Sequence, residues 1–142
     1  MLIDEKTGLE VLTRQECLQL LASHHLGRLG LSIGSRPMVL PVNYVLDGER
    51  IIFRTDEGTK FNEAVRGSFV ALEIDDIDTF YRSGWSVVVA GRADEVTNDA
   101  DRKHVQDLPL RPWARGQKSH WVAIEPTTIT GRRIRSDLPV DV

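Results

Sequence analysis

The stretch PVNYVLDGERIIFRT, residues 41–55, contains two strand-like runs joined by a tight turn. Asp47-Gly48 is a hairpin signal, because glycine readily adopts the positive φ that short hairpin turns require. Pro41 has no N–H to donate to a neighbouring strand, so it predicts an edge or a bulge in the first of the two strands. The stretch therefore predicts an antiparallel hairpin with an irregular first strand.

Upstream of this hairpin, the spacing of apolar residues changes from a helical period to a strand period. Thr13 and Glu16 have the spacing of a capping box, and leucines follow at helical intervals, which predicts a helix over residues 13–24. In the next segment Leu29 and Leu31 alternate with polar or small residues, which predicts a half-buried strand. A turn at residues 34–35 then leads into the strand at 37–46.

Downstream, the same criteria predict two more short helices and three or four strands. The helices are expected at 59–67 and 98–108, and the strands at 68–75, 84–96 and 119–134, the last in one piece or broken at Pro126. Gly91 is a candidate bulge within its strand. Because most strands follow one another through short turns, we predict a mainly β protein with short α-helices, an antiparallel sheet and a barrel.

Composition narrows the classes of protein that the chain can represent. Its 142 residues suit a single domain, 1–142, with a flexible tail expected at 136–142. A net charge of -3 argues against nucleic-acid binding, and no apolar run approaches the length of a membrane span. Cys17 is the only cysteine, which excludes an internal disulfide and favours a cytoplasmic location.

The segment IIFRTDEGTKF, residues 51–61, places unusual chemistry at the end of a strand. Arg54 and Lys60 supply positive charge, and Thr55 and Thr59 supply hydroxyl groups. Arginine, lysine, hydroxyls and the amides at a helix start are the groups that bind phosphate. The alternative is a solvated strand end, and the residues alone leave the two interpretations about equal.

Other candidate sites are less specific. The four histidines and the acidic residues 75–78 show no metal-ligand spacing. His120 and Tyr44 are candidates for a proton donor, without a motif to support either. Trp113 lies in a proline-rich basic loop, where an aromatic ring can cover a flat ligand or contact a partner subunit.

Taken in order, the segments LGRLGLS, PVNYVLDG, IIFRTDEGTKF, SFVALEID and GWSVVVAGRADEV resemble the pyridoxamine 5'-phosphate oxidase-like flavin-binding proteins. The resemblance covers roughly residues 13–134 and is closest to the short bacterial members. It implies a six-stranded antiparallel split β-barrel that forms a homodimer, with FMN at the subunit interface. It also implies the positions of the residues that bind the cofactor. Arg54, Thr55, Thr59 and Lys60 would hold the phosphate, Pro41, Val42 and Asn43 would line the ring system, and Trp85 and Ser86 would approach it.

The chain departs from the vitamin B6 oxidases at its C-terminus, where GRRIRSDLPVDV lacks their substrate-binding extension. The resemblance therefore does not imply oxidation of pyridoxamine phosphate. Some short relatives use the deazaflavin F420, whose longer tail needs a basic groove. The residues that could form such a groove are Arg28, Arg111, Arg115, Lys118, Arg132, Arg133 and Arg135.

Three functions are consistent with this resemblance. The first is an FMN- or F420-dependent oxidoreductase that transfers hydride at N5 of the cofactor to a small redox substrate. The second is a flavin-binding carrier or sensor without turnover. The third is a haem-binding relative, which the absence of an assignable axial ligand disfavours.

Overall fold

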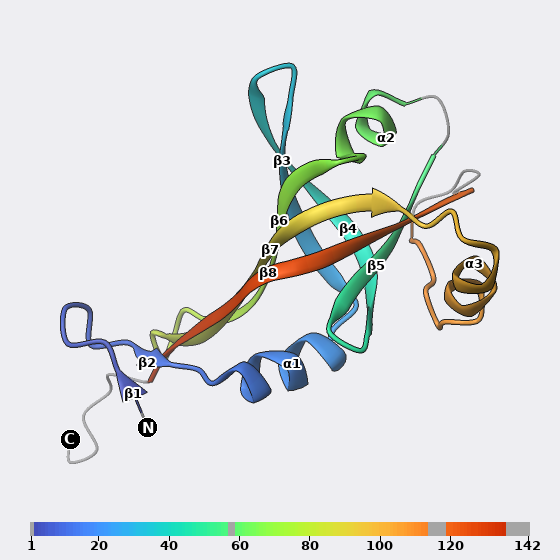
Figure 1. Ribbon diagram of the computed structural model, residues 1–142. Coiled ribbons are helices and arrows are strands. Elements are labelled where there is room, and N and C mark those ends of the chain that lie inside the picture. The colour runs from blue at the N-terminus through green and yellow to red at the C-terminus, as the bar shows by residue number, and fades with distance from the viewer. Residues whose placement is uncertain (1, 57–58, 114–118, 136–142) are drawn as a thin grey trace, which may run out of the picture.

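A computed structural model describes residues 2–56, 59–113 and 119–135, and the predicted tail at 136–142 lies outside this part of the chain. Within it there are eight strands and three helices (Figure 1). In chain order they are β1 (Leu2–Ile3), β2 (Glu10–Val11), α1 (Arg14–Ala22), β3 (Leu26–Ile33), β4 (Arg36–Asp47), β5 (Arg50–Thr55), α2 (Lys60–Val65), β6 (Ser68–Asp78), β7 (Ser83–Glu95), α3 (Asp99–Gln106) and β8 (His120–Ile134).

Strands β3 to β8 form the predicted six-stranded antiparallel barrel. The sheet runs in the order β1-β2-β8-β5-β4-β3-β6-β7, and an additional pairing of β7 with β8 closes it. The predicted split-barrel fold is therefore confirmed. The small β1–β2 hairpin, which pairs with the end of β8, was not predicted, because two-residue strands are too short to show any alternation.

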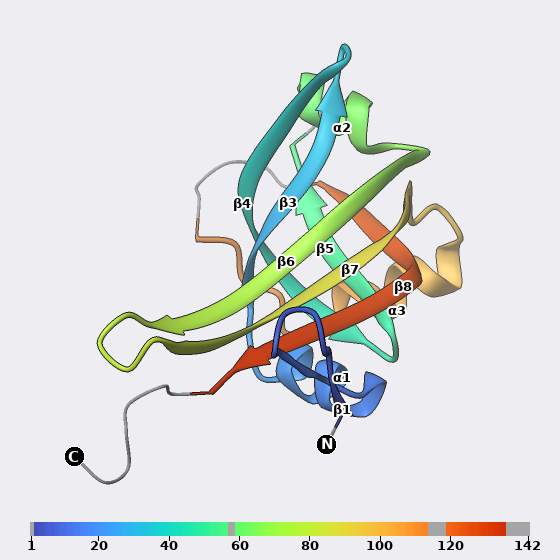
Figure 2. The ribbon, with the colours of Figure 1, turned by 90° about the vertical axis from the view of Figure 1, so that its left-hand side faces the viewer.

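The two ends of the barrel are covered by helices. Figures 1 and 2 show α1 and α2 at opposite ends. The capping box of α1 is present, with the Thr13 hydroxyl accepting from the Glu16 N–H at 3.1 Å and the Glu16 carboxylate accepting from the Thr13 N–H at 3.0 Å. Helix α1 buries Cys17 and Leu21 against the barrel core.

Strand β5 is buried on both of its faces. Ile51 and Phe53 point into the barrel core, and Ile52 belongs to a second apolar cluster that includes Val105 of α3. The sequence IIF is apolar without alternation because each face of the strand packs against a different apolar cluster. The burial of both faces fixes the end of β5, where the predicted phosphate-binding residues begin.

Strand β4 changes neighbours partway along its length. Residues 36–43 pair with β3, and residues 44–47 pair with β5. Pro41 thus lies where β4 has only one paired neighbour, and its missing N–H costs no ladder hydrogen bond. The edge predicted from Pro41 is confirmed, and β4 and β5 diverge at this point.

The irregularity predicted at Gly91 is present, but the extra residue, Thr127, lies in the partner strand β8. The pairing of β7 with β8 shifts register between Ala90 and Gly91, opposite Pro126, and β8 continues through the proline as one strand. A Cβ atom at Gly91 would lie 2.0 Å from the carbonyl oxygen of Glu125. Only glycine fits here, because the obstacle is main chain that cannot rotate away.

We predict that Gly91→Ala lowers the free energy of unfolding by about 1–3 kcal/mol, the usual cost of overpacking. Gly30→Ala in β3 is the matched control, because its Cβ would meet nothing closer than 3.8 Å. Urea unfolding of both variants measures the difference. Equal stability of the two variants would contradict the close approach at Gly91.

An ion cluster attaches α3 to the β4–β5 hairpin. Arg50 binds Asp101 of α3 through two hydrogen bonds of 2.6 and 2.9 Å, and it binds Asp47 at 3.0 Å. His104 Nε2 lies 2.8 Å from the second oxygen of Asp47. The hydrogen bond from Arg50 is the main cause that lowers the pKa of Asp101. The cluster fixes α3 and, with it, the segment that follows the helix.

Because its folded-state pKa lies below the ordinary value of 3.8, Asp101 stabilises the fold above about pH 4. This contribution is lost as the pH falls through the lowered pKa. The free energy of unfolding of the wild type should therefore exceed that of Asp101→Asn by about 1 kcal/mol at pH 7. The difference is small because the Arg50–Asp101 ion pair is partly exposed to solvent. Chemical unfolding from pH 7 to pH 2.5 measures this difference. A difference that stays constant over the whole range would contradict the assignment.

Candidate functional site

A cavity of about 310 Å³ opens where β4 and β5 diverge. It is lined by Leu40, Pro41, Val42, Asn43, Arg54, Thr55, Asp56, Thr59, Phe61 and Pro112. Six of the ten residues predicted to bind the cofactor are among them: Pro41, Val42, Asn43, Arg54, Thr55 and Thr59. The structure therefore brings the predicted ring-binding strand and most of the predicted phosphate-binding residues to one place.

The free edge of β4 contributes main-chain groups to this cavity. The Tyr44 N–H donates to the His25 carbonyl at 2.9 Å, on the β3 side of the strand. Because the main-chain groups of successive residues in an antiparallel strand alternate in direction, those of Pro41 and Asn43 point away from β3. The cavity thus has a flat peptide wall whose polar groups face the gap between the strands.

Arg54 supplies a positive charge that is paired with no carboxylate of the described residues. Its guanidinium carbon lies 4.3 Å from the centroid of the Trp121 ring, a cation–π contact. Its Nε is buried, and no described residue accepts a hydrogen bond from it. The stack thus orients the guanidinium while leaving its hydrogen-bonding capacity for a ligand.

Asn43 also keeps an unused donor beside the cavity. Its Oδ1 accepts the Trp113 N–H at 2.8 Å, and its buried Nδ2 has no hydrogen-bond partner among the described residues. A buried donor without a partner is costly, and a bound ligand would supply the missing acceptor. Asn43 and Arg54 are thus the two lining residues with unused donors.

The two threonines already have structural partners. The Thr55 hydroxyl donates to Asn62 Oδ1 at 2.6 Å in the interior. The Thr59 hydroxyl caps α2, since it accepts the Asn62 N–H at 3.0 Å, and it lies 3.1 Å from the Asp56 carbonyl. Both hydroxyl groups already donate their hydrogens within the protein in this structure. Their role as phosphate ligands stays a prediction.

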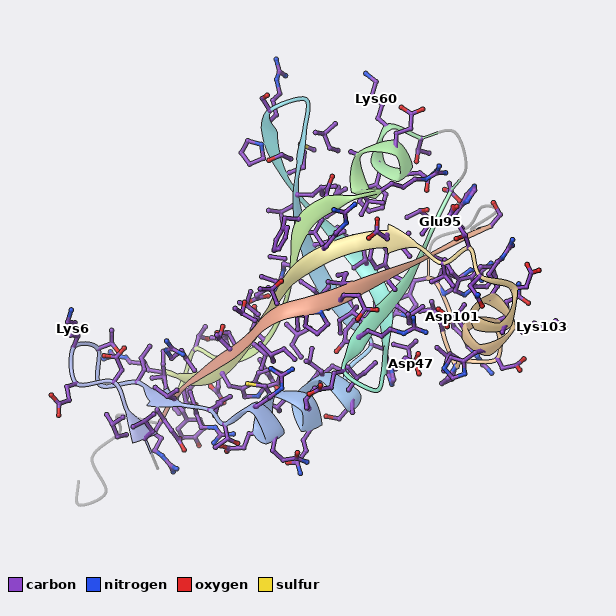
Figure 3. All side chains as sticks on the ribbon, viewed as in Figure 1. Lys6, Asp47, Lys60, Glu95, Asp101 and Lys103 are labelled. Atoms are coloured by element: carbon purple, nitrogen blue, oxygen red, sulfur yellow. The ribbon has the colours of Figure 1, made fainter. Side chains whose placement is uncertain are left out.

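Lys60, Trp85 and Ser86 do not line the cavity. Lys60 is exposed at the start of α2, and Figure 3 shows its side chain extending away from the barrel. Trp85 and Ser86 lie near the start of β7, where the Trp85 ring packs edge-on against His24 with centroids 4.9 Å apart. Within one chain, the structure separates these three predicted residues from the other predicted ligands.

Trp113 lies at the rim of the cavity. Its main chain is held by Asn43, and the preceding residue, Pro112, contributes to the lining. The side chain of Trp113 is 75% exposed. This geometry is compatible with the predicted covering role, which stays a prediction.

Neither candidate proton donor reaches the cavity. Tyr44 is fully buried, its hydroxyl donates to the Leu21 carbonyl at 2.8 Å, and burial raises its pKa above the ordinary value of 10.0. His120 is hydrogen-bonded through Nδ1 to Glu95 and lines a neighbouring hollow instead. Tyr44 therefore stabilises the attachment of α1 to the barrel.

The arginines proposed for a basic groove do not gather at the cavity either. Arg28 is paired with Glu73 and Asp75 at 3.1 and 2.8 Å. Arg133 and Arg135 are 3.5 and 3.3 Å from Glu10. Arg115 and Lys118 lie outside the described residues. In the described part of the chain, most of the predicted basic residues thus stand apart from the cavity or are neutralised by carboxylates.

Several lining residues were not predicted. Leu40 and Phe61 supply apolar surface, and Pro112 arrives from the segment after α3. Trp121 was not among the predicted site residues, and its contact with Arg54 depends on the pairing of β5 with β8. The alternation of residues in β5 and β8 shows which side chains of each strand share a face. It would have placed Arg54 and Trp121 together only if the pairing of the two strands had been known.

No group of described residues has the composition of a metal site, and no described helix is long and apolar enough to cross a membrane. The cavity lining contains no histidine, cysteine or methionine among the described residues. The site therefore offers a flat peptide wall, apolar side chains, the acid Asp56 and one guanidinium, that of Arg54, which forms no ion pair with a described residue. These groups suit a planar, anionic ligand.

Comparison with known proteins agrees with this architecture. Residues 13–133 match the sequence model of the pyridoxamine 5'-phosphate oxidase family, and the chain belongs to that family. The chain is 41% identical over 131 residues to the uncharacterized protein Rv0080 of Mycobacterium tuberculosis, covering 89% of this chain and 86% of that protein.

Solved structures show the same fold. The FAD binding protein from Mycobacterium smegmatis is 39% identical, with a TM-score of 0.77, over 88% of this chain and 98% of that chain. A conserved protein of unknown function, DIP1874 from Corynebacterium diphtheriae, is 31% identical, with a TM-score of 0.74, over 87% of this chain and 96% of that one. The chain is thus a split barrel of the pyridoxamine 5'-phosphate oxidase family, by sequence and by fold.

Proposed function

We propose that the cavity at the split between β4 and β5 binds the flavin of a redox protein. The observation that carries this proposal is Arg54, a guanidinium stacked on Trp121 with a buried Nε that has no partner among the described residues. An unpaired arginine beside a flat peptide edge suits a ligand that combines a planar ring system with a phosphate.

The residues of the chain then have distinct roles. Val42, Leu40 and Phe61 exclude water from one side of the ring system, and the β4 edge offers it main-chain hydrogen bonds. Arg54 holds the phosphate, and the Asn43 Nδ2 donates to a carbonyl or hydroxyl of the ligand. When bound, the flavin supplies hydride or electron transfer at its N5. Reduction of the holoprotein by NADH, NADPH or reduced F420 would distinguish an oxidoreductase of small substrates from a carrier.

The choice of cofactor follows from the same residues. FMN and FAD share the phosphate next to the ribityl chain, and the relative from Mycobacterium smegmatis is described as an FAD binding protein. F420 is the weaker alternative, because the described arginines expected to bind its tail are largely paired with carboxylates. Haem is disfavoured, because the described lining offers no axial ligand.

We further propose that a second copy of the chain completes the site. The cavity is open along the β4 edge, and Trp113 at its rim is largely exposed. On the outer face of β3, β4 and β6 there is an apolar hollow of about 410 Å³, where Val39 and Phe69 are 67% and 66% exposed. Adjacent exposed apolar side chains of this kind favour burial against a partner.

Arg54→Ala should weaken FMN binding roughly ten- to hundredfold, because a charge-assisted hydrogen bond to the phosphate is lost. Riboflavin, which lacks the phosphate, should bind both proteins about equally. Lys60→Ala should cost less, because the Lys60 side chain extends into solvent. Titration followed by flavin fluorescence measures all three proteins. An equal loss for riboflavin and FMN would show that Arg54 shapes the cavity without holding the phosphate.

The dimer is tested by light scattering at micromolar concentration, where the wild type should have twice the chain mass. Phe69→Glu places a charge on the apolar outer face and should give monomers. Phe80→Glu is the matched control, because Phe80 is 76% exposed at the turn between β6 and β7 and should leave the dimer intact. A monomeric wild type, or a Phe69→Glu variant that stays dimeric, would refute this interface.

A further inference from the structure

A second hollow adjoins the flavin cavity at the Arg54–Trp121 stack. It has a volume of about 250 Å³ and is lined by Glu95, Val96, Thr97, Arg102, Ser119, His120 and Trp121. Arg54 lines the first cavity and Trp121 lines the second hollow, and the guanidinium of one lies over the ring of the other. The Arg54–Trp121 stack therefore links the linings of the two cavities.

Three different elements build this second hollow. The end of β7 and the two residues after it line the hollow together with the start of β8, and Arg102 comes from the first half of α3. Figure 3 shows Glu95 at the end of β7. The hydrogen bonds of α3 to Arg50, described above, hold Arg102 near the hollow. The hollow is thus part of the folded framework.

The polar groups of the hollow are suited to an anion. Glu95, the only described acid in the lining, is hydrogen-bonded to His120 Nδ1, and Arg66 at 3.6 Å offsets part of its charge. Arg102 makes no ion pair with any described residue, which leaves its guanidinium available. Thr97 and Ser119 add hydroxyl groups, and Trp121 adds an aromatic ring.

We propose that this hollow receives the adenosine diphosphate half of a flavin dinucleotide whose flavin half occupies the first cavity. The inference rests on the flavin site proposed above. A pyrophosphate carries two phosphate groups. Arg54 stacks on Trp121, Arg102 lines the same hollow as Trp121, and neither guanidinium forms an ion pair with a described carboxylate. Each can bind one phosphate through a forked pair of hydrogen bonds.

The remaining lining residues suit the nucleoside. Hydroxyl groups such as those of Thr97 and Ser119 hydrogen-bond to ribose, and the Trp121 ring offers an apolar surface to a purine. Size points the same way, because the first cavity, at about 310 Å³, lies at the lower end of the ~300–1,000 Å³ typical of ligand sites. A dinucleotide needs the additional space, whereas a mononucleotide leaves the second hollow to solvent.

The test compares FAD, FMN and riboflavin on the wild type, on Arg102→Ala and on Lys103→Ala. Arg102→Ala should weaken FAD binding roughly tenfold or more and change FMN binding less than twofold, because only FAD reaches Arg102. Lys103→Ala removes a neighbouring charge of the same helix that does not line the hollow, and it should leave all three affinities unchanged. Thermal melting of the apoproteins checks that both variants fold.

Two outcomes would overturn the proposal. If Arg102→Ala weakens FAD and FMN equally, Arg102 acts on the shared part of the cofactor. If it changes neither, the second hollow does not bind the distal half. A wild type that binds none of the flavins would instead refute the flavin site itself, so the two failures are distinguishable.

Discussion

The change of neighbours along β4 is the constraint on which the rest of this structure depends. A strand that pairs with β3 up to residue 43 and with β5 from residue 44 leaves half of each edge without a partner. Backbone groups at such an edge need hydrogen-bond acceptors and donors from elsewhere. Pro41 reduces that need by removing one donor. The remaining groups face a cavity, so the opening that splits the barrel also supplies a binding wall.

Arg54 illustrates how the fold can keep a charge available at such a wall. An arginine beside a carboxylate would be neutralised before any ligand arrives. Stacking on Trp121 instead orients the guanidinium through a contact worth about 0.5–2 kcal/mol. The N–H donors of the guanidinium stay available for a ligand. The contact exists because β5 and β8 pair with Arg54 opposite Trp121. The outer apolar cluster under α3 buries the neighbouring Ile52 on the same face and so stabilises this register.

Most of the fold could be predicted from local signals. The capping box at Thr13, the turn at Gly48, the edge at Pro41 and the irregularity at Gly91 each follow from a single physical requirement of the main chain, and each is present. The β1–β2 hairpin could not be predicted, since its strands are two residues long and depend on pairing with β8. The candidate site was predictable only in part, because six of the ten expected residues line one cavity and Lys60, Trp85, Ser86 and Trp113 do not.

The sequence by itself determined the kind of elements, their order and the chemistry available at the end of β5. These properties depend on neighbouring residues, through periodicity, capping and turn geometry. Only the tertiary structure decided which of the cations is free, because the pairing of Arg28 with Glu73 and of Arg135 with Glu10 joins residues far apart in the chain. It also placed Arg54 on Trp121 and brought Arg102 to the hollow that Trp121 lines, since both arrangements require the barrel to close and α3 to pack on its side.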